Sequence, residues 1–120
     1  MSLRALIVDD EAPARSRLRR LLDPFVEAGR LTDLAEAADG VEAVEALSAD
    51  RFDVAFLDVQ MPGLDGFGVI EALAPGQRPD VVFTTAFDEY AVRAFEANAT
   101  DYLLKPIGAD RLEAAVARVE

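Results

Sequence analysis

Cysteine and histidine are both missing from this sequence of 120 residues. Without cysteine there can be no disulfide framework and no thiolate metal site, which suits a reducing compartment. Without histidine there can be no imidazole general base, no histidine-ligated zinc and no phosphohistidine. If the chain takes part in phosphoryl chemistry, any histidine involved must come from a partner.

Positive charge is scarce, because 12 Lys and Arg residues face 23 Asp and Glu residues and leave a net charge of −11. A domain this acidic repels nucleic acid, so we expect no direct contact with DNA or RNA. It could still control a DNA-binding domain elsewhere in a longer chain. No apolar run approaches the roughly 20 residues that span a membrane. The first apolar run meets Asp9 and Asp10 too early for a signal peptide. We therefore expect a cytoplasmic domain without membrane contact.

Apolar residues make up 52% of the chain and charged residues 29%, a globular composition, and the length fits one domain over residues 1–120. Five apolar runs predict strands, and the first, third and fourth are continuous, as in strands covered on both faces. Asp33 and Glu36 interrupt the second run, which we expect at an edge of the sheet. The runs lie at 5–8, 31–37, 54–57, 81–83 and 102–104.

Five helical patterns alternate with these strands, and Pro13 suits the first turn of the first helix. Strands that alternate with helices predict an α/β fold with a five-stranded parallel sheet. We expect the flavodoxin-like, doubly wound (βα)5 architecture with strand order 2-1-3-4-5. The apolar positions of the five helices are Ala14, Leu18, Leu21, Leu22 and Phe25; Val41, Val44 and Leu47; Phe67, Ile70 and Leu73; Ala91, Ala94 and Phe95; and Leu112, Ala115, Val116 and Val119.

Polar or ionisable residues follow four of the five predicted strands. In an open parallel sheet, ligands bind at the carboxyl ends of the strands. Turn preferences explain each residue taken singly, but four together at one edge favour a site. The residues are Asp9 and Asp10 after the first strand, Asp58 after the third, Thr84 and Thr85 after the fourth, and Lys105 with Pro106 after the fifth.

The first and third strands are neighbours in this order, about 4.8 Å apart, so Asp9, Asp10 and Asp58 crowd one another. Carboxylates this close must be protonated or share a cation. Oxygen ligands at an open site suit Mg²⁺, for which Mn²⁺ could substitute. A carboxylate can also act as a nucleophile and form an acyl phosphate. The Thr85 hydroxyl and the Lys105 ammonium can hold phosphate oxygens.

These motifs resemble those of response-regulator receiver domains of two-component systems, the CheY-like family. The pattern Asp58-x-x-Met61-Pro62-x-x-x-Gly66 is the most specific. It lies in order with Asp9-Asp10, Thr85-Ala86 and Lys105-Pro106, and the resemblance extends over essentially the whole chain.

The resemblance implies a role for each matching residue. Asp58 would be the phosphoacceptor, and Thr85 and Lys105 would contact the phosphoryl group. Tyr102 would be the switch aromatic, which changes rotamer as Thr85 moves. The Lys105–Pro106 peptide bond is expected to be cis. The implied ligands of Mg²⁺ are Asp10, Asp58 and the backbone carbonyl of Gln60 directly, and Asp9 through a water. Gln60 and Phe87 would tune the phosphorylation lifetime, with Phe87 shielding the phosphoryl group from water.

The resemblance also implies partners. A sensor histidine kinase would phosphorylate Asp58, and the face of the fourth helix, fifth strand and fifth helix would change and be read by an effector, with possible homodimerisation. The chain would not be an enzyme with a separate substrate, since only self-phosphorylation and autodephosphorylation at Asp58 are expected. The stretches 84–96 and 101–107 look like receivers that precede a LytTR-type DNA-binding domain. We therefore expect transcription regulation as the output, and a chain that is part of a longer protein.

Three alternative functions remain open. One is an interaction or dimerisation module that works without phosphorylation. Another is a Mg²⁺-dependent phosphohydrolase using an aspartyl phosphate, although the expected Asp-x-Asp-x-Thr pattern and a cap domain are missing. A flavin carrier would need a phosphate loop after the first strand, which is also missing. Separately, four arginines on the first helix are either a solvated basic face or a kinase docking surface: Arg15, Arg17, Arg19 and Arg20.

Overall fold

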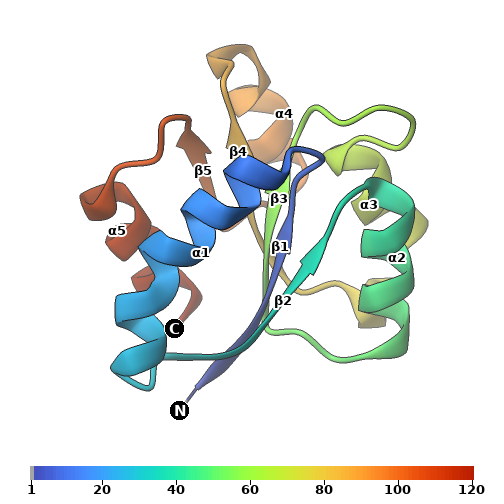
Figure 1. Cartoon of the computed structure of the whole chain (residues 1–120). Coiled ribbons are helices and arrows are strands. Elements are labelled where there is room, and N and C mark those ends of the chain that lie inside the picture. The colour runs from blue at the N-terminus through green and yellow to red at the C-terminus, as the bar shows by residue number, and fades with distance from the viewer. Residues whose placement is uncertain (1) are drawn as a thin grey trace.

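The computed structural model, which describes residues 2–120, contains one five-stranded parallel sheet (Figure 1). The strand order is β2-β1-β3-β4-β5, which confirms the predicted order 2-1-3-4-5 and the flavodoxin-like fold. β2 lies at one edge of the sheet, as its interrupted pattern indicated. The strands are β1 (Leu3–Val8), β2 (Leu31–Ala37), β3 (Val54–Asp58), β4 (Asp80–Thr85) and β5 (Asp101–Leu104).

Five α-helices cover the two faces of the sheet. In Figure 1, α1 and α5 lie to the left of the sheet and α2 and α3 to the right. α4 packs through Ala94 into the same core as α2 and α3. The bounds are α1 (Ala12–Glu27), α2 (Gly40–Ala49), α3 (Gly66–Ala72), α4 (Ala91–Glu96) and α5 (Ala109–Val119), with two short 3₁₀ helices, η1 (Pro75–Gln77) and η2 (Asp88–Tyr90). Within the described residues, no helix is both long and apolar enough to cross a bilayer.

The alternation of side chains along the central strands divides the core into two layers. Phe56 of β3 packs with the α1 and α5 side chains, while Leu57 packs with those of α2, α3 and α4. All five residues of β3 are buried, and the first four form the continuous apolar run that is typical of a strand covered on both faces. Each fully buried aromatic or aliphatic side chain stabilises the fold by about 1.5–3 kcal/mol. The sheet is therefore a rigid platform for the residues at its carboxyl edge.

Strand register brings the predicted polar residues to one edge. Val8 lies beside Leu57, so the residues that follow β1 meet the end of β3. Asp58 lies beside Thr84, and Thr85 beside Leu104. The backbone N–H of Lys105 then donates to the Thr85 carbonyl at 2.7 Å, which continues the β4–β5 ladder by one residue.

Side-chain caps fix the start of two helices at this edge. Asp39 accepts a hydrogen bond from the Glu42 N–H at the start of α2, and Asp65 accepts one from the Gly68 N–H at the start of α3. Pro13 lies in the first turn of α1, as predicted. The caps hold α2 and α3 with their N-termini beside the carboxyl ends of β1 and β3.

Three of the predicted apolar helix positions are wrong as core positions. Val41 is 61% exposed and Phe95 is 83% exposed, and Ala91 is exposed as well. α4 has only six residues, so it buries little more than Ala94 and leaves the next side chain, Phe95, in solvent. In α2 the buried positions are Gly40, Ala43 and Leu47, one residue out of phase with Val41. Apolar residues therefore remain on the surface of α4.

Candidate acidic site

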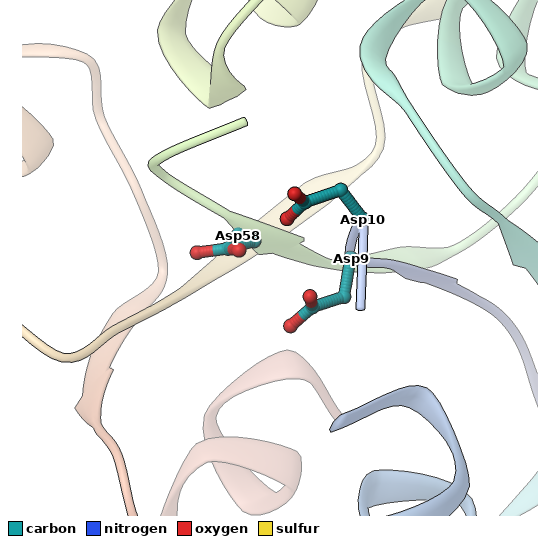
Figure 2. A group of neighbouring side chains, drawn as sticks. All are labelled: Asp9, Asp10 and Asp58. Carbon is teal, nitrogen blue, oxygen red and sulfur yellow. The ribbon is translucent and has the colours of Figure 1, made fainter. Parts of the chain in front are cut away.

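Three carboxylates gather at the carboxyl edge of the sheet (Figure 2). Asp9 and Asp10 follow β1, and Asp58 ends β3, with one oxygen of each within 4.8 Å of the others. Asp9 and Asp58 are buried, whereas Asp10 is exposed. The predicted crowding is therefore present, in a cluster that is open to solvent on the Asp10 side.

Asp9 is held by contacts on both its side chain and its backbone. Its carboxylate accepts hydrogen bonds from the backbone N–H of Glu11 at 2.9 Å and from Lys105 Nζ at 2.7 Å. Its carbonyl accepts a hydrogen bond of 2.8 Å from the Arg15 guanidinium. These contacts hold Asp9 in place before any ligand arrives.

The surroundings of Asp58 disfavour its ionised form. Burial, and then the charge of Asp9, raises the pKa of Asp58 from 3.8 to about 6, while Lys105 and the backbone amide of Gln60 oppose the rise. A carboxylate with this pKa is largely ionised near neutral pH yet poorly stabilised by its surroundings. The site therefore favours any group that reduces its negative charge.

Lys105 is the cation closest to these acids. Its Nζ lies 2.7 Å from Asp9 and 3.6 Å from Asp58. Burial disfavours the ammonium, but the hydrogen bond to Asp9 and the charges of both acids outweigh burial and raise the pKa of Lys105. Lys105 is thus charged and already bound to the cluster. The peptide bond that follows it, Lys105–Pro106, is cis, in agreement with the expectation from the resemblance.

Thr85 and Tyr102 both contact Phe87. The buried Thr85 hydroxyl oxygen accepts a hydrogen bond of 3.2 Å from the Phe87 N–H. The Tyr102 hydroxyl donates to the Phe87 carbonyl. Burial raises the pKa of Tyr102, against a contact with the Tyr90 backbone amide that lowers it. Tyr102 is half-buried and packs against the core on the α2, α3 and α4 side of the sheet.

The loop between β3 and α3 explains the spacing of the Asp58 motif. Gly63 has φ +76°, a conformation that suits glycine. The N–H of Gly66 donates to the Val59 carbonyl at 2.9 Å. A Cβ at Gly66 would lie 2.5 Å from the Asp58 carbonyl oxygen, so only glycine allows α3 to begin so close to β3.

The sequence did not reveal a hydrogen bond between Gln60 and Tyr90. Gln60 Nε2 donates to the Tyr90 hydroxyl at 2.6 Å, across 30 positions of sequence. Both residues border an open groove of about 430 Å³ at the β3–α3 loop, with Met61, Pro62, Gly63 and Asp65. Only the tertiary arrangement brings them together, and no local pattern signals the contact.

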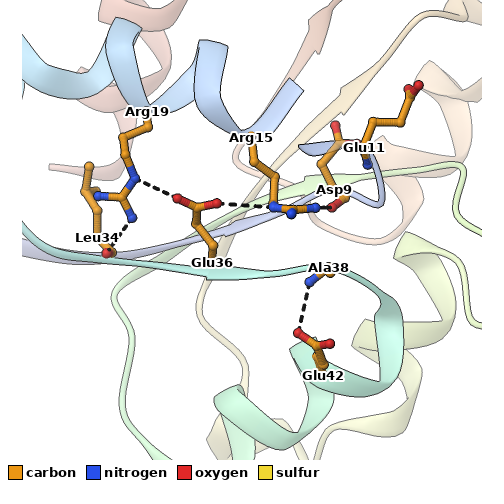
Figure 3. A network of polar contacts seen from close by, with 8 residues as sticks. All are labelled: Asp9, Glu11, Arg15, Arg19, Leu34, Glu36, Ala38 and Glu42. Atoms are coloured by element: carbon orange, nitrogen blue, oxygen red, sulfur yellow. Dashed lines mark hydrogen bonds and ion pairs between the residues drawn. The ribbon is translucent and has the colours of Figure 1, made fainter. Parts of the chain in front are cut away.

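Most arginines of α1 form ion pairs or hydrogen bonds within the molecule, unlike those of a purely solvated basic face. Arg15 and Arg19 both bind Glu36 of β2, at 3.2 and 2.7 Å (Figure 3). Their hydrogen bonds lower the pKa of Glu36, with the Arg19 bond contributing most. Arg17 reaches the Ile107 carbonyl at 3.4 Å, and Arg20 is exposed. Arg15 therefore has a role inside the molecule, in addition to any docking role.

The composition of the site fits a divalent cation. Three carboxylates lie within 4.8 Å, and Lys105 is the one cation that contacts them among the described ion pairs. This leaves an excess of negative charge and a set of oxygen ligands with one solvent-exposed member, the arrangement that suits Mg²⁺ with part of its water shell. A carboxylate nucleophile beside that charge suits transfer of an anionic group.

Comparison with known proteins identifies the family that this chain matches and several of its relatives. The family model described as "Response regulator receiver domain" matches residues 5–117. The transcriptional regulatory protein BtsR of Escherichia coli strain K12 is 47% identical over 117 residues, covering 98% of this chain and 48% of that protein. The chain thus spans about half the length of the curated relatives it matches.

Solved structures agree with the fold. The response regulatory domain of protein mrkE from Klebsiella pneumoniae is 31% identical with a TM-score of 0.83, over 98% of this chain and 94% of that one. The REC domain of AraT, a response regulator from Geobacillus stearothermophilus, is 36% identical with a TM-score of 0.83, over 99% and 93%.

Proposed function

The chain belongs to the response regulator receiver domain family, and from that premise we propose that it accepts a phosphoryl group on Asp58 in a reaction that requires Mg²⁺. The phosphoryl group then shifts the α4–β5–α5 face between two states that a partner or attached domain reads. The single observation that carries the proposal is the position of Asp58, a buried carboxylate within a cluster of three acids and 3.6 Å from the Lys105 ammonium.

Asp58 supplies the nucleophile. One of its carboxylate oxygens forms a bond to phosphorus while the bond from phosphorus to the donor's leaving atom breaks, and the leaving group keeps the electron pair. Asp58 is largely ionised at neutral pH, since its pKa is about 6. Burial in this setting removes competing hydration from the carboxylate, and positioning accounts for most of what a protein supplies in phosphoryl transfer.

Asp9, Asp10, Asp58 and the backbone carbonyl of Gln60 would hold the cation. Mg²⁺, when bound, neutralises charge on the phosphoryl oxygens and on the carboxylate cluster. Lys105 balances part of the remaining charge, since it already contacts Asp9 and Asp58. The Thr85 hydroxyl would exchange its contact with the Phe87 N–H for one with a phosphoryl oxygen, and this exchange would release the Phe87 segment.

We infer from the receiver domain family that the donor is a sensor histidine kinase. The phosphohistidine would belong to that partner, because this chain has no histidine. The α1 side of the acidic site offers a surface for such a partner. An apolar groove of about 310 Å³ runs beside the Lys105–Pro106 segment. Its lining side chains are Ala14, Arg17, Leu18, Leu21 and Ile107.

The output would be control of transcription through an effector domain of the LytTR type. The supporting observations are the stretches 84–96 and 101–107 and the name of the BtsR relatives, which are about twice as long as this chain. Three large apolar side chains on the α4 and β5 surface are exposed and available to an effector or to a second copy. They are Val92, Phe95 and Leu104.

A second candidate function is an interaction module that works without phosphorylation, favoured by the 83% exposure of Phe95. One experiment separates the two: intact-mass spectrometry after incubation with acetyl phosphate, with and without Mg²⁺, for wild type and Asp58→Asn. We expect one phosphoryl adduct that needs both Mg²⁺ and Asp58. If the folded wild type binds Mg²⁺ but gains no adduct, phosphoacceptor function is wrong for small donors, and the interaction module becomes the better account.

A further inference from the structure

Gln60 connects two segments that the sequence separates. It lies in the loop that follows β3, two residues after Asp58. Its side-chain amide donates a 2.6 Å hydrogen bond to the hydroxyl of Tyr90, which ends η2 and immediately precedes α4. The bond therefore crosses from the acidic site to the start of the helix whose surface exposes Val92 and Phe95.

The backbone of Gln60 lies close to the acceptor in sequence and in its effect. Its amide acts to lower the pKa of Asp58, so the residue has its backbone near the acidic site and its side chain on Tyr90. The resemblance to receiver domains adds the Gln60 carbonyl as a cation ligand. A displacement of the Gln60 backbone on cation binding would therefore move the amide that holds Tyr90.

Tyr90 is in turn fixed to the remaining switch residues. Its ring packs against Phe67 and Phe87, with centroids 6.3 and 6.4 Å away. Its backbone amide opposes the rise in the pKa of Tyr102, whose hydroxyl donates to the Phe87 carbonyl. The route from Asp58 through Gln60 and Tyr90 thus reaches Phe87 without passing through Thr85.

Phe87 is where this route meets the one through Thr85. Its N–H donates to the Thr85 hydroxyl, its carbonyl accepts from Tyr102, and its ring meets Tyr90 edge-on at 89°. Because Phe87 contacts both Thr85 and Tyr90, a displacement of either residue can move the η2–α4 segment. Thr85 is expected to respond to the phosphoryl group, whereas Gln60 is adjacent to the cation-binding acids.

We propose that Gln60 is a positioning residue whose hydrogen bond to Tyr90 couples cation binding at the acidic cluster to the conformation of the η2–α4 segment, before any phosphoryl transfer. The inference rests on the proposed function for its cation site. It goes beyond that function because it assigns a response to Mg²⁺ alone and a route that uses neither the phosphoryl group nor Thr85. Coupling is reciprocal, so breaking the bond changes Mg²⁺ affinity as much as Mg²⁺ changes the segment.

The expected coupling free energy is the net contribution of one hydrogen bond at a solvent-accessible site. A net contribution of this kind corresponds to roughly a two- to tenfold change in affinity. Two substitutions remove the bond and keep the shape. Gln60→Met retains the length of the side chain without a donor, and Tyr90→Phe retains the ring that packs on Phe67 and Phe87.

The test is a double-mutant cycle on Mg²⁺ binding, followed by backbone amide NMR of Gln60→Met, Tyr90→Phe and the double variant. Gln77→Met is the matched control, because Gln77 lies in η1 and is the only other glutamine in the chain. In wild type and the control, saturating Mg²⁺ should shift the amides of Asp9, Asp10 and Asp58 and also those of residues 88–96. Each single variant should weaken Mg²⁺ binding about two- to tenfold, and the double variant should weaken it no further.

The readouts distinguish failure of this inference from failure of the proposed function. In both single variants the Mg²⁺-induced shifts at 88–96 should disappear while those at the acids persist. Independent effects of the two substitutions, or undiminished shifts at 88–96, would overturn the coupling and leave the cation site intact. If Mg²⁺ shifts none of the acidic residues in wild type, the cation site and the coupling are both wrong.

Discussion

Lys105 Nζ lies 2.7 Å from a carboxylate oxygen of Asp9, although the two residues are 96 positions apart. The same ammonium lies 3.6 Å from Asp58. The sequence pointed to Lys105 as a contact of the incoming phosphoryl group. The structure adds that Lys105 is an ion-pair partner of the acids and acts to lower the pKa of Asp58.

Replacing Lys105 should therefore impair the acceptor before any donor binds. In Lys105→Met the charge that lowers the pKa of Asp58 is lost, so this pKa should rise above about 6. If this pKa rises by about one unit, the ionised fraction of Asp58 at pH 7 falls from about nine-tenths to about one half, so we expect acetyl phosphate to label the variant about twofold more slowly at pH 7. The labelling rate should be measured from pH 5.5 to 8.5, where its midpoint should move upward.

Lys105→Arg is the matched control, because it keeps the charge at what is the only lysine of the chain. Its labelling midpoint should remain close to that of wild type even if its rate falls, since a guanidinium has a different shape. If Lys105→Met leaves the midpoint of labelling unchanged, Lys105 does not tune Asp58.

Asp58 should make stability depend on pH. Its pKa is raised from 3.8 to about 6 in the folded chain, so the folded state binds the proton more tightly than the unfolded state. The sign follows from linkage: this group's contribution is most favourable below about pH 4 and is lost as pH rises through about 6. In the absence of Mg²⁺, Asp58→Asn should be more stable than wild type at pH 7.5.

The gain for Asp58→Asn should be on the order of 1–2 kcal/mol, after allowance for solvent screening of the cluster. Urea unfolding at pH 4 and pH 7.5 in the presence of EDTA measures it. The difference between the two proteins should shrink markedly at pH 4. If the difference in the free energy of unfolding between the two proteins is the same at both pH values, folding does not raise the pKa of Asp58.

Gly66 should be intolerant of any side chain. A Cβ there would lie 2.5 Å from the Asp58 carbonyl oxygen, so Gly66→Ala must push α3 away from the end of β3. We expect a loss of about 1–3 kcal/mol in the free energy of unfolding, the usual cost of overpacking. Gly76→Ala, where nothing lies within 4 Å of the added atom, should change stability by no more than about 0.5 kcal/mol. Equal losses of stability for Gly66→Ala and Gly76→Ala in thermal unfolding would contradict the close approach of α3 to the end of β3.

Arg15 should matter more to the acidic site than Arg19 does. Both bind Glu36, but Arg15 alone of the two donates to the Asp9 carbonyl, whereas Arg19 donates to the Leu34 carbonyl. Arg15→Met and Arg19→Met each remove one positive charge and one contact with Glu36, so they differ in the carbonyl contact that is lost and in how close the lost charge lies to the acids. We expect Mg²⁺ to bind Arg15→Met several-fold more weakly than Arg19→Met, as for loss of one hydrogen bond. Calorimetric titration of both variants gives the comparison, and equal affinities would remove Arg15 from the site.

Kinase docking on α1 is a separate prediction for the same residues. Charge reversal of Arg15 and Arg19 should slow transfer from the kinase more than transfer from acetyl phosphate. Because Arg15 also supports Asp9, some loss with the small donor is expected as well. Equal losses with both donors would leave only the internal role of Arg15.

Patterns that are local in sequence predicted much of this molecule. The continuous apolar runs of β1, β3 and β4 reflect strands covered on both faces. The polar residues that follow four of the five apolar runs meet because parallel strands end at one edge. The second strand was placed at an edge because Asp33 and Glu36 interrupt it, and it is an edge strand.

Features that depend on tertiary geometry could not be predicted in this way. Phe95 was expected in the core because it continues an apolar pattern, but α4 is too short to turn it inward. The Gln60–Tyr90 bond and the Arg15 contact with the Asp9 carbonyl join residues whose side chains have no sequence pattern in common. Their partners are fixed by how loops and helices pack, which periodicity does not encode.

The central claim is that Asp58 receives the phosphoryl group, and its most direct test locates the group on the chain. The protein is incubated with acetyl phosphate and Mg²⁺, treated with borohydride to reduce the acyl phosphate to an alcohol, digested and mapped by peptide mass. The account predicts that the reduced residue is at position 58 alone, that it depends on Mg²⁺, and that Asp9 and Asp10 are unmodified. Reduction at Asp9, Asp10 or another carboxylate, with position 58 unchanged in the folded protein, would contradict it.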